Sequence, residues 1–465
     1  MKSEIDVASV ENYPWDHLTG SQRELFVGAR GVVSYQQFFQ LVDEWKKLLS
    51  ISGVKPEEKI AVIGDFSALG TSLVLALLSN RNIIIPFSYE SIIEIDSALS
   101  TSGCDWLIKI DKLKLLSDQI IEQRSIHQDN SLFQQLAKSG HAGLVLFSSG
   151  TSGKPKAILH DLNRVVQRFK PNAKRFRSIP MLMFDHFGGF NTIFGMLSSE
   201  STVVEVDTRT VENICSTIQE FKVTLLPTTP SFLSLIIMSN ADKRFDLSSL
   251  TRITYGTEPI NVHLLERINK VFPNAILQQT YGLSEVGVLA SRSESNESTR
   301  LELGGSGFET KVVDGILWIK SEFAMLGYLS TEGANDFVDG WFNTKDQVIQ
   351  DGKYFKFVGR DSDQINVGGQ KVLPIEVEEE IMLLNEVLDV QVFGEKHLLL
   401  GQIVVANVVL ASGVESEGIK LKIRKHCQER LTKYKVPQKI FFVSQIEVSS
   451  RGKRVKGVSS ETGKE

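Results

Sequence analysis

Residues 147–157 read Phe-Ser-Ser-Gly-Thr-Ser-Gly-Lys-Pro-Lys-Ala, and they indicate the fold more strongly than any other stretch of the chain. Apolar residues 144–147 predict a buried strand before them, and a pattern typical of a helix begins near Ile158. Glycines let backbone N–H groups approach phosphate oxygens, hydroxyls add donors and lysines add charge. The stretch therefore predicts an anion-binding loop. It is not a P-loop, because Ser148 and Pro155 replace the glycine and the hydroxyl residue of that motif.

Composition places the chain among ordinary globular proteins. Its 465 residues are enough for two or more domains, and 42% hydrophobic with 23% charged residues is typical of a soluble fold. A net charge of −5 gives no reason to expect nucleic acid or an anionic membrane as partner, and the apolar runs are too short to span a bilayer. The three cysteines are scattered, and the N-terminus lacks a signal-peptide pattern. We expect a cytoplasmic protein without a membrane or nucleic-acid partner.

Helical and strand patterns alternate along much of the chain. Such alternation predicts largely parallel sheets covered by helices. The sequence pattern changes after Gly359-Arg360, where a polar stretch and then a glycine pair follow. We therefore expect an α/β fold: a large domain with mostly parallel sheets over residues 1–361, and a small mobile α+β domain over residues 362–465. The expected helices are residues 35–49, 72–78, 211–221 and 232–238, and the expected strands are residues 59–63, 83–86, 202–206 and 223–227.

The loop at residues 148–156 resembles the phosphate loop of the adenylate-forming superfamily, which includes acyl-CoA synthetases, luciferases and the adenylation domains of peptide synthetases. The resemblance implies that this loop binds the phosphates of ATP and that Thr151 also takes part in catalysis. The residues that carry this expectation are Ser148, Ser149, Gly150, Thr151, Ser152, Gly153, Lys154 and Lys156.

A second segment, Tyr281-Gly282-Leu283-Ser284-Glu285, resembles the Tyr-Gly-x-Thr-Glu motif of the same family, with serine in place of threonine. The resemblance implies that Tyr281 packs against adenine, that Gly282 and Ser284 lie at the nucleotide and that Glu285 holds Mg²⁺. A single carboxylate together with phosphate oxygens suits Mg²⁺.

Two further segments follow in the family's order. Asp346 ends a stretch that resembles aromatic-x-Thr-Gly-Asp, although Lys345 replaces the usual glycine. The resemblance implies that Asp346 binds the ribose hydroxyls and that Arg360 adds a second contact to the nucleotide. It also places the interdomain hinge at Ser362, and it implies that Gly368 and Gly369 line the channel for a pantetheine arm after rotation of the small domain.

Near the C-terminus, Ser449-Ser450-Arg451-Gly452-Lys453 resembles the family's Thr-x-x-Gly-Lys loop. Lys453 is accordingly the candidate catalytic lysine. Glu447 stands where the family usually has proline, and a one-step shift of the alignment would put Arg451 or Arg454 in that role.

Two shorter matches complete the expected site. Tyr255-Gly256-Thr257-Glu258-Pro259 resembles the segment beside adenine, so Gly256, Thr257 and Glu258 are candidate nucleotide-binding residues. His186, three residues before Gly189, resembles the histidine that flanks the carboxylate site of acyl-CoA synthetases. The same segment contains Asp185, which matches the aspartate of amino-acid-activating relatives; only one of the two alignments holds, and the glycine pair favours His186.

The resemblance implies ATP-dependent activation of a carboxylic acid as an acyl adenylate with release of pyrophosphate. Transfer of the acyl group to the thiol of CoA follows, with ATP, Mg²⁺ and CoA as cofactors. Two alternatives stay open: an acyl- or aminoacyl-adenylating enzyme that loads the phosphopantetheine of a carrier protein, and a non-catalytic ATP-binding homologue, which Lys345 and Glu447 favour. The sequence does not name the acid or the oligomeric state.

Overall fold

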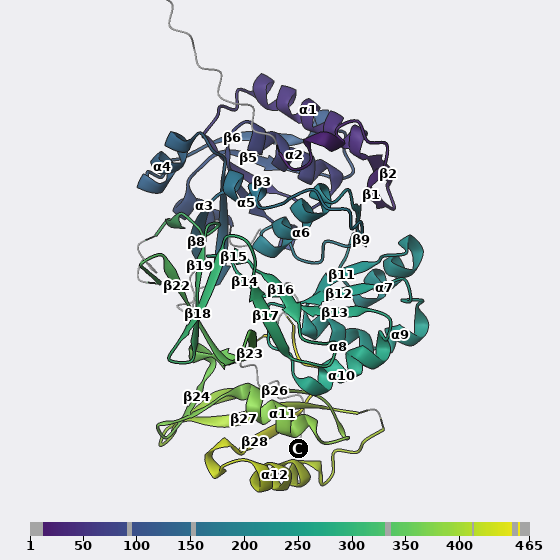
Figure 1. Cartoon of the computed structure of the whole chain (residues 1–465), viewed down its shortest axis with the longest axis vertical. Coiled ribbons are helices and arrows are strands. Elements are labelled where there is room, and N and C mark those ends of the chain that lie inside the picture. Colours follow the sequence, from purple (N-terminus) through teal and green to yellow (C-terminus); the bar gives the residue numbers. More distant parts are fainter. Residues whose placement is uncertain are drawn as a thin grey trace, which may run out of the picture. The chain divides into compact units, whose positions relative to one another are not determined.

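The computed structural model describes residues 13–90, 95–149, 155–330, 336–411, 413–448 and 454–455. It contains two compact units (Figure 1). The chain passes from one unit to the other more than once. The first unit comprises Met1–Phe147, Ala157–Pro180 and Phe184–Glu205, and the second comprises Ser148–Lys156, Met181–Met183 and Val206–Glu465.

The larger sheet of the first unit is built around β3 (Lys59–Ile63), which pairs in parallel with β4 (Ile83–Phe87) and β5 (Cys104–Lys109). Residues 60–63 of β3 are all buried, as expected for a parallel strand covered on both faces. In this unit the strand order is β8 (Pro155–Asp161), β7 (Gly143–Ser149), β4, β3, β5 and β6 (Ile120–Ile126).

The first two helices of this unit confirm the sequence pattern. The α1 helix (Tyr35–Ser52) begins at a capping box in which the Ser34 hydroxyl accepts from the Gln37 backbone and the Gln37 side chain accepts from the Ser34 backbone. The α2 helix (Ala68–Ser79) is capped by Ser67 and is buried almost throughout. The other helices of the unit are α3 (Ile95–Ser102), α4 (Ser131–Ser139), α5 (Leu162–Gln167) and α6 (Phe187–Ser198).

The prediction of a helix from Ile158 is wrong. Residues 155–161 form strand β8, and the next helix, α5, begins only at Leu162, where the Asp161 side chain accepts from the Arg164 backbone. Residues 157–160 are all fully buried, and the apolar run Ala157-Ile158-Leu159 is too short for its periodicity to separate a buried strand from a buried helix. The predicted phosphate loop therefore connects two strands rather than a strand and a helix.

A smaller sheet completes the first unit. The β1 strand (Glu24–Gly28) pairs in parallel with β10 (Thr202–Val204) and antiparallel with β2 (Gly31–Ser34), and β9 (Arg177–Ser178) pairs in parallel with β10. Residues 203 and 204 are fully buried. The strand predicted at residues 202–206 is confirmed, although it ends two residues earlier.

The second unit begins with a parallel arrangement of β11 (Leu225–Thr228), β12 (Arg252–Tyr255) and β13 (Ile276–Gln279). Figure 1 shows the helices that connect and flank these strands. They are α7 (Val211–Phe221), α8 (Pro230–Met238), α9 (Ala241–Arg244) and α10 (Val262–Val271).

An antiparallel sheet follows in the same unit. Its strand order is β16 (Ala290–Ser293), β17 (Arg300–Gly304), β23 (Tyr354–Arg360), β22 (Trp341–Asp351), β19 (Ile316–Ser321) and β18 (Phe308–Val313). Alternate residues of β22 are buried, which is the period of a strand with one covered face. Just before this sheet in the sequence, the short strands β14 (Gly282–Leu283) and β15 (Gly287–Val288) form an antiparallel hairpin. The short strand β21 (Phe337–Val338) pairs with β22.

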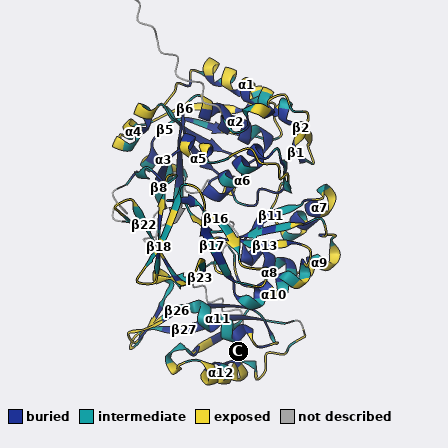
Figure 2. Ribbon diagram, viewed as in Figure 1, coloured by how far each residue is buried: buried dark blue, intermediate teal, exposed yellow. Residues whose placement is uncertain are grey.

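The C-terminal part of the second unit has its own apolar core, formed by residues between 365 and 440 (Figure 2). A long antiparallel hairpin of β26 (Val387–His397) and β27 (Gly401–Leu410) carries most of it, because residues 403–406 of β27 are all buried. Around the hairpin lie β24 (Ile365–Val367), β25 (Gln370–Val372), α11 (Pro374–Met382), α12 (Ile419–Arg430) and β28 (Lys439–Phe442).

The architecture confirms the predicted class, a mixed α/β fold with a large N-terminal part and a smaller C-terminal part. A domain boundary at residues 361/362 stays a prediction. No helix in the described part of the chain combines the length and the apolar character that a membrane span requires.

Candidate functional site

Most of the expected phosphate loop lies outside the described residues, as does the candidate catalytic lysine. Ser148 and Ser149 end β7, and Lys156 lies in β8. The ammonium of Lys156 lies 5.1 Å from the centre of the Tyr328 ring, within cation–π range. The end of the loop is thus attached to a tyrosine that sequence reasoning did not identify. The expected residues that cannot be described are Gly150, Thr151, Ser152, Gly153, Lys154 and Lys453.

Tyr328 in turn contacts the expected metal ligand. Its hydroxyl donates to Glu285 Oε1 at 3.1 Å, and the Glu285 backbone carbonyl accepts from the Met325 N–H at 2.8 Å. Burial raises the pKa of Glu285, and the bond from Tyr328 and the charge of Arg360 offset this only in part. Glu285 is therefore a carboxylate in a poorly solvated position, where a bound cation would favour its ionised form.

The donor set fits Mg²⁺ only in combination with a phosphorylated ligand. Glu285 offers hard carboxylate oxygens, and its hydrogen-bond partner Tyr328 is a neutral phenol that leaves the carboxylate charge in place. Within the described residues, no group of three or more His, Cys, Asp and Glu side chains is arranged to hold a metal ion. Mg²⁺ commonly takes one or two carboxylates and fills its other positions with phosphate oxygens and water.

Tyr281 and Asp346, 65 residues apart in the sequence, meet in the same part of the second unit. The Tyr281 hydroxyl donates to Asp346 Oδ2 at 2.5 Å. The Tyr281 ring stacks on Phe357 with 4.4 Å between the ring centres and 23° between the planes. Burial, followed by the charge of Asp346, raises the pKa of Tyr281 well above its ordinary value. The hydroxyl therefore stays protonated and fixes the orientation of both side chains.

Asp346 also pairs with Arg360, and strand register accounts for the contact. Asp346 on β22 lies directly opposite Arg360 on β23. Arg360 Nε donates to Asp346 Oδ1 at 2.6 Å. The aspartate side chain is 8% exposed, whereas the arginine side chain is 47% exposed. Burial alone would lower the pKa of Arg360, but the charge of Asp346 raises it, so the guanidinium is firmly cationic.

The departure at Lys345 leaves the local turn intact. Lys345 has φ +60°, in the left-handed region that usually favours glycine. Its backbone N–H donates to Asn343 Oδ1 at 2.9 Å, and its ammonium donates to Asp336 at 2.8 Å. The conformation expected of the family's glycine is thus held by a lysine whose charge is paired with Asp336.

We call Tyr281, Glu285, Tyr328, Asp346 and Arg360 the Tyr281 cluster. The charge of Arg360 acts on Glu285 as well as on Tyr281, so these side chains share one electrostatic environment. Sequence reasoning expected four of the five together and missed Tyr328. The only sequence signal for Tyr328 is an aromatic residue after Gly327, which is too common to single out.

Two expected glycines are explained by packing. A Cβ on Gly256 would lie 2.5 Å from Thr280 Oγ1 and 2.6 Å from its carbonyl oxygen, and a Cβ on Gly282 would lie 2.7 Å from Val288 Cα. Neither position has room for a side chain. The segments that contain Tyr255 and Tyr281 can therefore approach their neighbours closely.

Thr257, Glu258 and Ser284 also belong to the second unit. Glu258 Oε1 accepts from the Ser231 N–H at 2.7 Å in the first turn of α8, and its Oε2 accepts from the Arg454 N–H at 3.4 Å. Thr257 is exposed with φ +70°, and Ser284 is half-buried. Roles for these three residues at a nucleotide remain predictions.

The two candidates for the acid site lie in the first unit. His186 is half-buried and is the N-cap of α6, where its Nδ1 accepts from the Gly188 N–H at 3.0 Å. Asp185 is buried. The structure does not choose between the two alignments, so both stay predictions.

The glycine pair of the C-terminal part forms a two-residue hairpin turn. Val367 of β24 lies opposite Gln370 of β25, and Gly368 and Gly369 between them have φ +58° and +85°. Two successive positive φ values are typical of the tight hairpin turn that favours glycine. Ser362, the expected hinge, lies in an exposed 3₁₀ turn (Asp361–Asp363) and donates to Asp363 at 3.0 Å.

Comparison with known proteins agrees with this arrangement. Residues 16–329 match the family model described as AMP-binding enzyme, and residues 376–453 match the model described as AMP-binding enzyme C-terminal domain. The chain is 25% identical over 429 residues to peroxisomal OPC-8:0-CoA ligase 1 of Arabidopsis thaliana, which covers 84% of this chain and 78% of that protein. It is 29% identical over 340 residues to acyl-CoA synthetase 7 of Caenorhabditis elegans, covering 66% of this chain and 63% of that protein.

Among solved structures, the anthranilate CoA ligase AuaEII in complex with anthranoyl-AMP is similar in fold. The TM-score is 0.79 at 19% sequence identity, and the match covers 95% of each chain. At this identity the likeness concerns the fold alone. Because the first family model covers about two thirds of the chain, the protein belongs to the family of AMP-binding enzymes.

Proposed function

We propose that this protein is an AMP-forming acid–CoA ligase, which activates a carboxylic acid with ATP and then transfers the acyl group to the thiol of CoA. The observation that carries the proposal is the position of Asp346. Its buried carboxylate accepts from Tyr281 and from the half-exposed Arg360, whose charge also offsets part of the rise that burial causes in the pKa of Glu285. This combination provides acceptors for ribose hydroxyls and charge for phosphate within a family whose members bind AMP.

In the first step, a carboxylate oxygen of the acid forms a bond to the α-phosphorus of ATP as the bond to pyrophosphate breaks. No base is needed, because the nucleophile is already an anion. The obstacle is repulsion between two anions, so positioning and electrostatic stabilisation carry the catalysis. Asp346 would orient the ribose, Arg360 would place charge near the phosphates, and the Tyr281 ring would pack against adenine.

Mg²⁺ bound at Glu285 would supply further neutralisation of the phosphate charge. Lys156 lies over the Tyr328 ring and this carboxylate accepts from the Tyr328 hydroxyl, so a cation and the expected metal ligand contact the same tyrosine. By the family resemblance, Lys453 would add a point charge between the carboxylate and the α-phosphate.

In the second step, the CoA sulfur bonds to the acyl carbon, the bond from that carbon to the AMP oxygen breaks and the thiol proton is lost to solvent. The Gly368–Gly369 turn leaves room for a pantetheine arm, because neither residue carries a side chain. Rotation about Ser362 would exchange this turn for Lys453 at the reacting carbon.

A non-catalytic homologue is the less supported alternative. Its strongest sequence argument was Lys345, and the turn at that position is kept. Glu447, the other departure, accepts from the Val455 N–H at 2.9 Å and so takes part in ordinary backbone pairing. Loading of a carrier protein stays open as the acceptor alternative, because both acceptors present a phosphopantetheine thiol. A cytoplasmic location also stays a prediction from the sequence.

The test is ATP-dependent release of pyrophosphate across a panel of aryl, fatty and amino acids, each with and without CoA. Lys453→Ala is the test variant, and Lys433→Ala, an exposed lysine of the same part of the chain, is its matched control. The proposal expects release with one acid class, a thioester only when CoA is present, and loss of release only in Lys453→Ala. Adenylate without CoA turnover would favour a carrier-protein acceptor. ATP binding without release from any acid would favour the non-catalytic homologue.

A further inference from the structure

Two backbone contacts join the residues on either side of the segment 449–453, which lies outside the described residues and contains Lys453. Val448 and Arg454 form an antiparallel bridge, and the Val455 N–H donates to the Glu447 carbonyl at 2.9 Å. The side chain of Gln391, on β26, donates to the Val455 carbonyl at 2.9 Å. The position of the residue that follows Lys453 is therefore set by its attachment to the C-terminal sheet.

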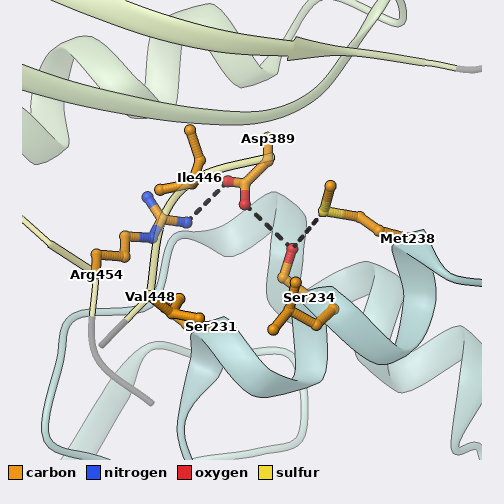
Figure 3. A pocket seen from close by; sticks show the side chains of 8 residues that line it. Ser231, Ser234, Met238, Asp389, Ile446, Val448 and Arg454 are labelled. Atoms are coloured by element: carbon orange, nitrogen blue, oxygen red, sulfur yellow. Dashed lines mark hydrogen bonds and ion pairs between the residues drawn. The ribbon is translucent and has the colours of Figure 1, made fainter. Parts of the chain in front are cut away.

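Arg454 makes the strongest of these attachments (Figure 3). Its Nη2 donates to Asp389 Oδ1 at 2.8 Å. Its Nη1 donates to the Val390 carbonyl at 2.7 Å. The arginine side chain is 19% exposed and the aspartate side chain 7%. One guanidinium thus binds both a side chain and a backbone carbonyl of β26. A lysine ammonium on a flexible stem cannot make both contacts with this fixed geometry.

The same aspartate reaches across to the N-terminal part of the unit. Ser234, on α8, donates to Asp389 Oδ2 at 3.2 Å (Figure 3). Arg267, on α10, donates to the Leu388 carbonyl at 2.6 Å. Both contacts join helices before Ser362 to the β26 strand after it. They exist only while the two parts keep this arrangement.

Glu258 completes the connection from the loop that follows β12. One of its oxygens accepts from the Ser231 N–H of α8 and the other accepts from the Arg454 N–H. We call Arg454, Asp389, Ser234, Glu258 and Glu378 the Arg454 cluster, because the charges of the three carboxylates all act on Arg454. Burial raises the pKa of Glu378, and the charge of Arg454 opposes that shift.

This geometry also argues against one alternative that the sequence left open. Under a shifted alignment Arg454 could have been the catalytic cation, but its guanidinium is committed to Asp389 and Val390 inside the C-terminal part. A buried, paired side chain is not available to a substrate carboxylate. Lys453 therefore stays the candidate from the sequence, Arg451 stays open as the alternative, and Arg454 is an anchor.

We infer that Arg454 is a positioning residue: its bonds to β26 and, through Asp389, to α8 fix the chain at the residue that follows Lys453, and this attachment supports adenylate formation. The inference rests on the proposed function. Arg454 acts through its neighbour and need not touch substrate. Ser234 stabilises the same arrangement from the other side, through Asp389.

Single-turnover measurements of the two half-reactions test the inference. Arg454→Lys keeps the charge but loses the two-point contact, so adenylate formation should slow by about 10²-fold, as misplacement of a catalytic group does. Thioester formation from supplied acyl adenylate and CoA should stay at the wild-type rate, because Lys453 serves only the first step. Ser234→Ala should slow adenylate formation by about fivefold, the effect of one hydrogen bond. Arg430→Ala, which removes an exposed arginine of the same part of the chain, is the matched control.

A structural readout separates positioning from general damage. Hydrogen exchange at the Val455 amide, which is bonded to Glu447, should accelerate in Arg454→Lys but stay unchanged in Arg430→Ala. Wild-type rates of adenylate formation in Arg454→Lys would overturn the inference, and so would equal losses in both half-reactions. Absence of pyrophosphate release from the wild type with every acid would instead count against the proposed function.

Discussion

Two arginine–aspartate pairs in the second unit have the same chemistry and differ in how far the arginine is exposed to solvent. Asp346 and Asp389 are almost equally buried, with side chains 8% and 7% exposed. Their arginines are not alike, because Arg360 is 47% exposed and Arg454 only 19%. The exposed guanidinium suits a ligand, whereas the buried one suits an anchor between parts of the chain.

The second oxygen of each aspartate shows the same division. Asp346 Oδ2 accepts from Tyr281, whose ring stacks on Phe357. Asp389 Oδ2 accepts from Ser234, on a helix far away in sequence. The first pair therefore organises an aromatic site, and the second pair joins α8 to β26. An arginine–aspartate pair does not by itself reveal its role; burial and the third partner do.

The largest expected effect distinguishes the pairs by stability. Arg454→Ala should lower the free energy of unfolding by about 3 kcal/mol, because it leaves Asp389 and Glu378 buried without their cation. Arg360→Ala should cost less, about 1 kcal/mol, because water can replace a half-exposed guanidinium and Asp346 keeps its bond from Tyr281. Urea denaturation of both variants measures the difference. Equal losses would show that exposure does not separate the two pairs.

Affinity for ATP should depend on the Asp346–Arg360 pair and not on the Asp389–Arg454 pair. Asp346→Asn should weaken ATP binding at least about tenfold, since it removes a charged acceptor worth about 1.5 kcal/mol or more. Asp389→Asn should leave the affinity for ATP unchanged, because its carboxylate contacts Ser234 and Arg454. Isothermal titration calorimetry with ATP gives both dissociation constants. If Asp389→Asn weakened binding as much as Asp346→Asn, the assignment of the Tyr281 cluster to the nucleotide would be wrong.

A smaller effect on stability is expected at Lys345, in the turn that precedes Asp346. Lys345→Val should destabilise the protein by about 1–2 kcal/mol, because a β-branched residue is strained at φ +60°. Lys345→Gly should be close to neutral, since glycine relieves the backbone strain and loses only an ion pair between an exposed lysine and Asp336. Thermal unfolding measures both. A larger loss for glycine than for valine would mean that the Asp336 pair, and not the backbone, holds the turn.

The smallest effect is a pH dependence at Glu285, measured without nucleotide or metal. Burial raises the pKa of Glu285 above the ordinary glutamate value of 4.5, so the folded state binds more protons than the unfolded state above that pH. Its contribution to stability therefore falls as pH rises from about 4.5 through the raised pKa. Glu285→Gln should gain stability relative to wild type across that window and gain nothing below it. A difference independent of pH, in urea unfolding from pH 4 to 8, would contradict the assigned shift.

Local patterns allowed correct prediction of much of the fold. The strand predicted at residues 59–63 and the helix predicted at residues 211–221 have those bounds in the structure. Their periodicity and caps are local, so neighbouring residues suffice to specify them. The prediction of a helix from Ile158 was wrong because it also relied on local periodicity, and a strand that is buried on both faces has no alternation of apolar and polar residues.

The arrangement of some candidate site residues was expected from motif order, although their roles stay predictions. Tyr281, Glu285, Asp346 and Arg360 were expected together from motif order, and the structure brings them into one cluster. Tyr328 was not predicted, because it belongs to the site only through its contacts with Lys156 and Glu285. That property depends on how distant segments pack, and no local spacing records it.

The sequence by itself determined the alternation of helices and strands, the family and the identity of the charged groups, because these depend on residue type and near spacing. Only the tertiary structure decided which charges face solvent and which are buried as anchors. Arg454 and Asp389 are 65 residues apart, and the distinction between Arg360 and Arg454 rests on what covers each guanidinium. Burial is a property of the packed chain, and it sets both the cost of an unpaired charge and its availability to a ligand.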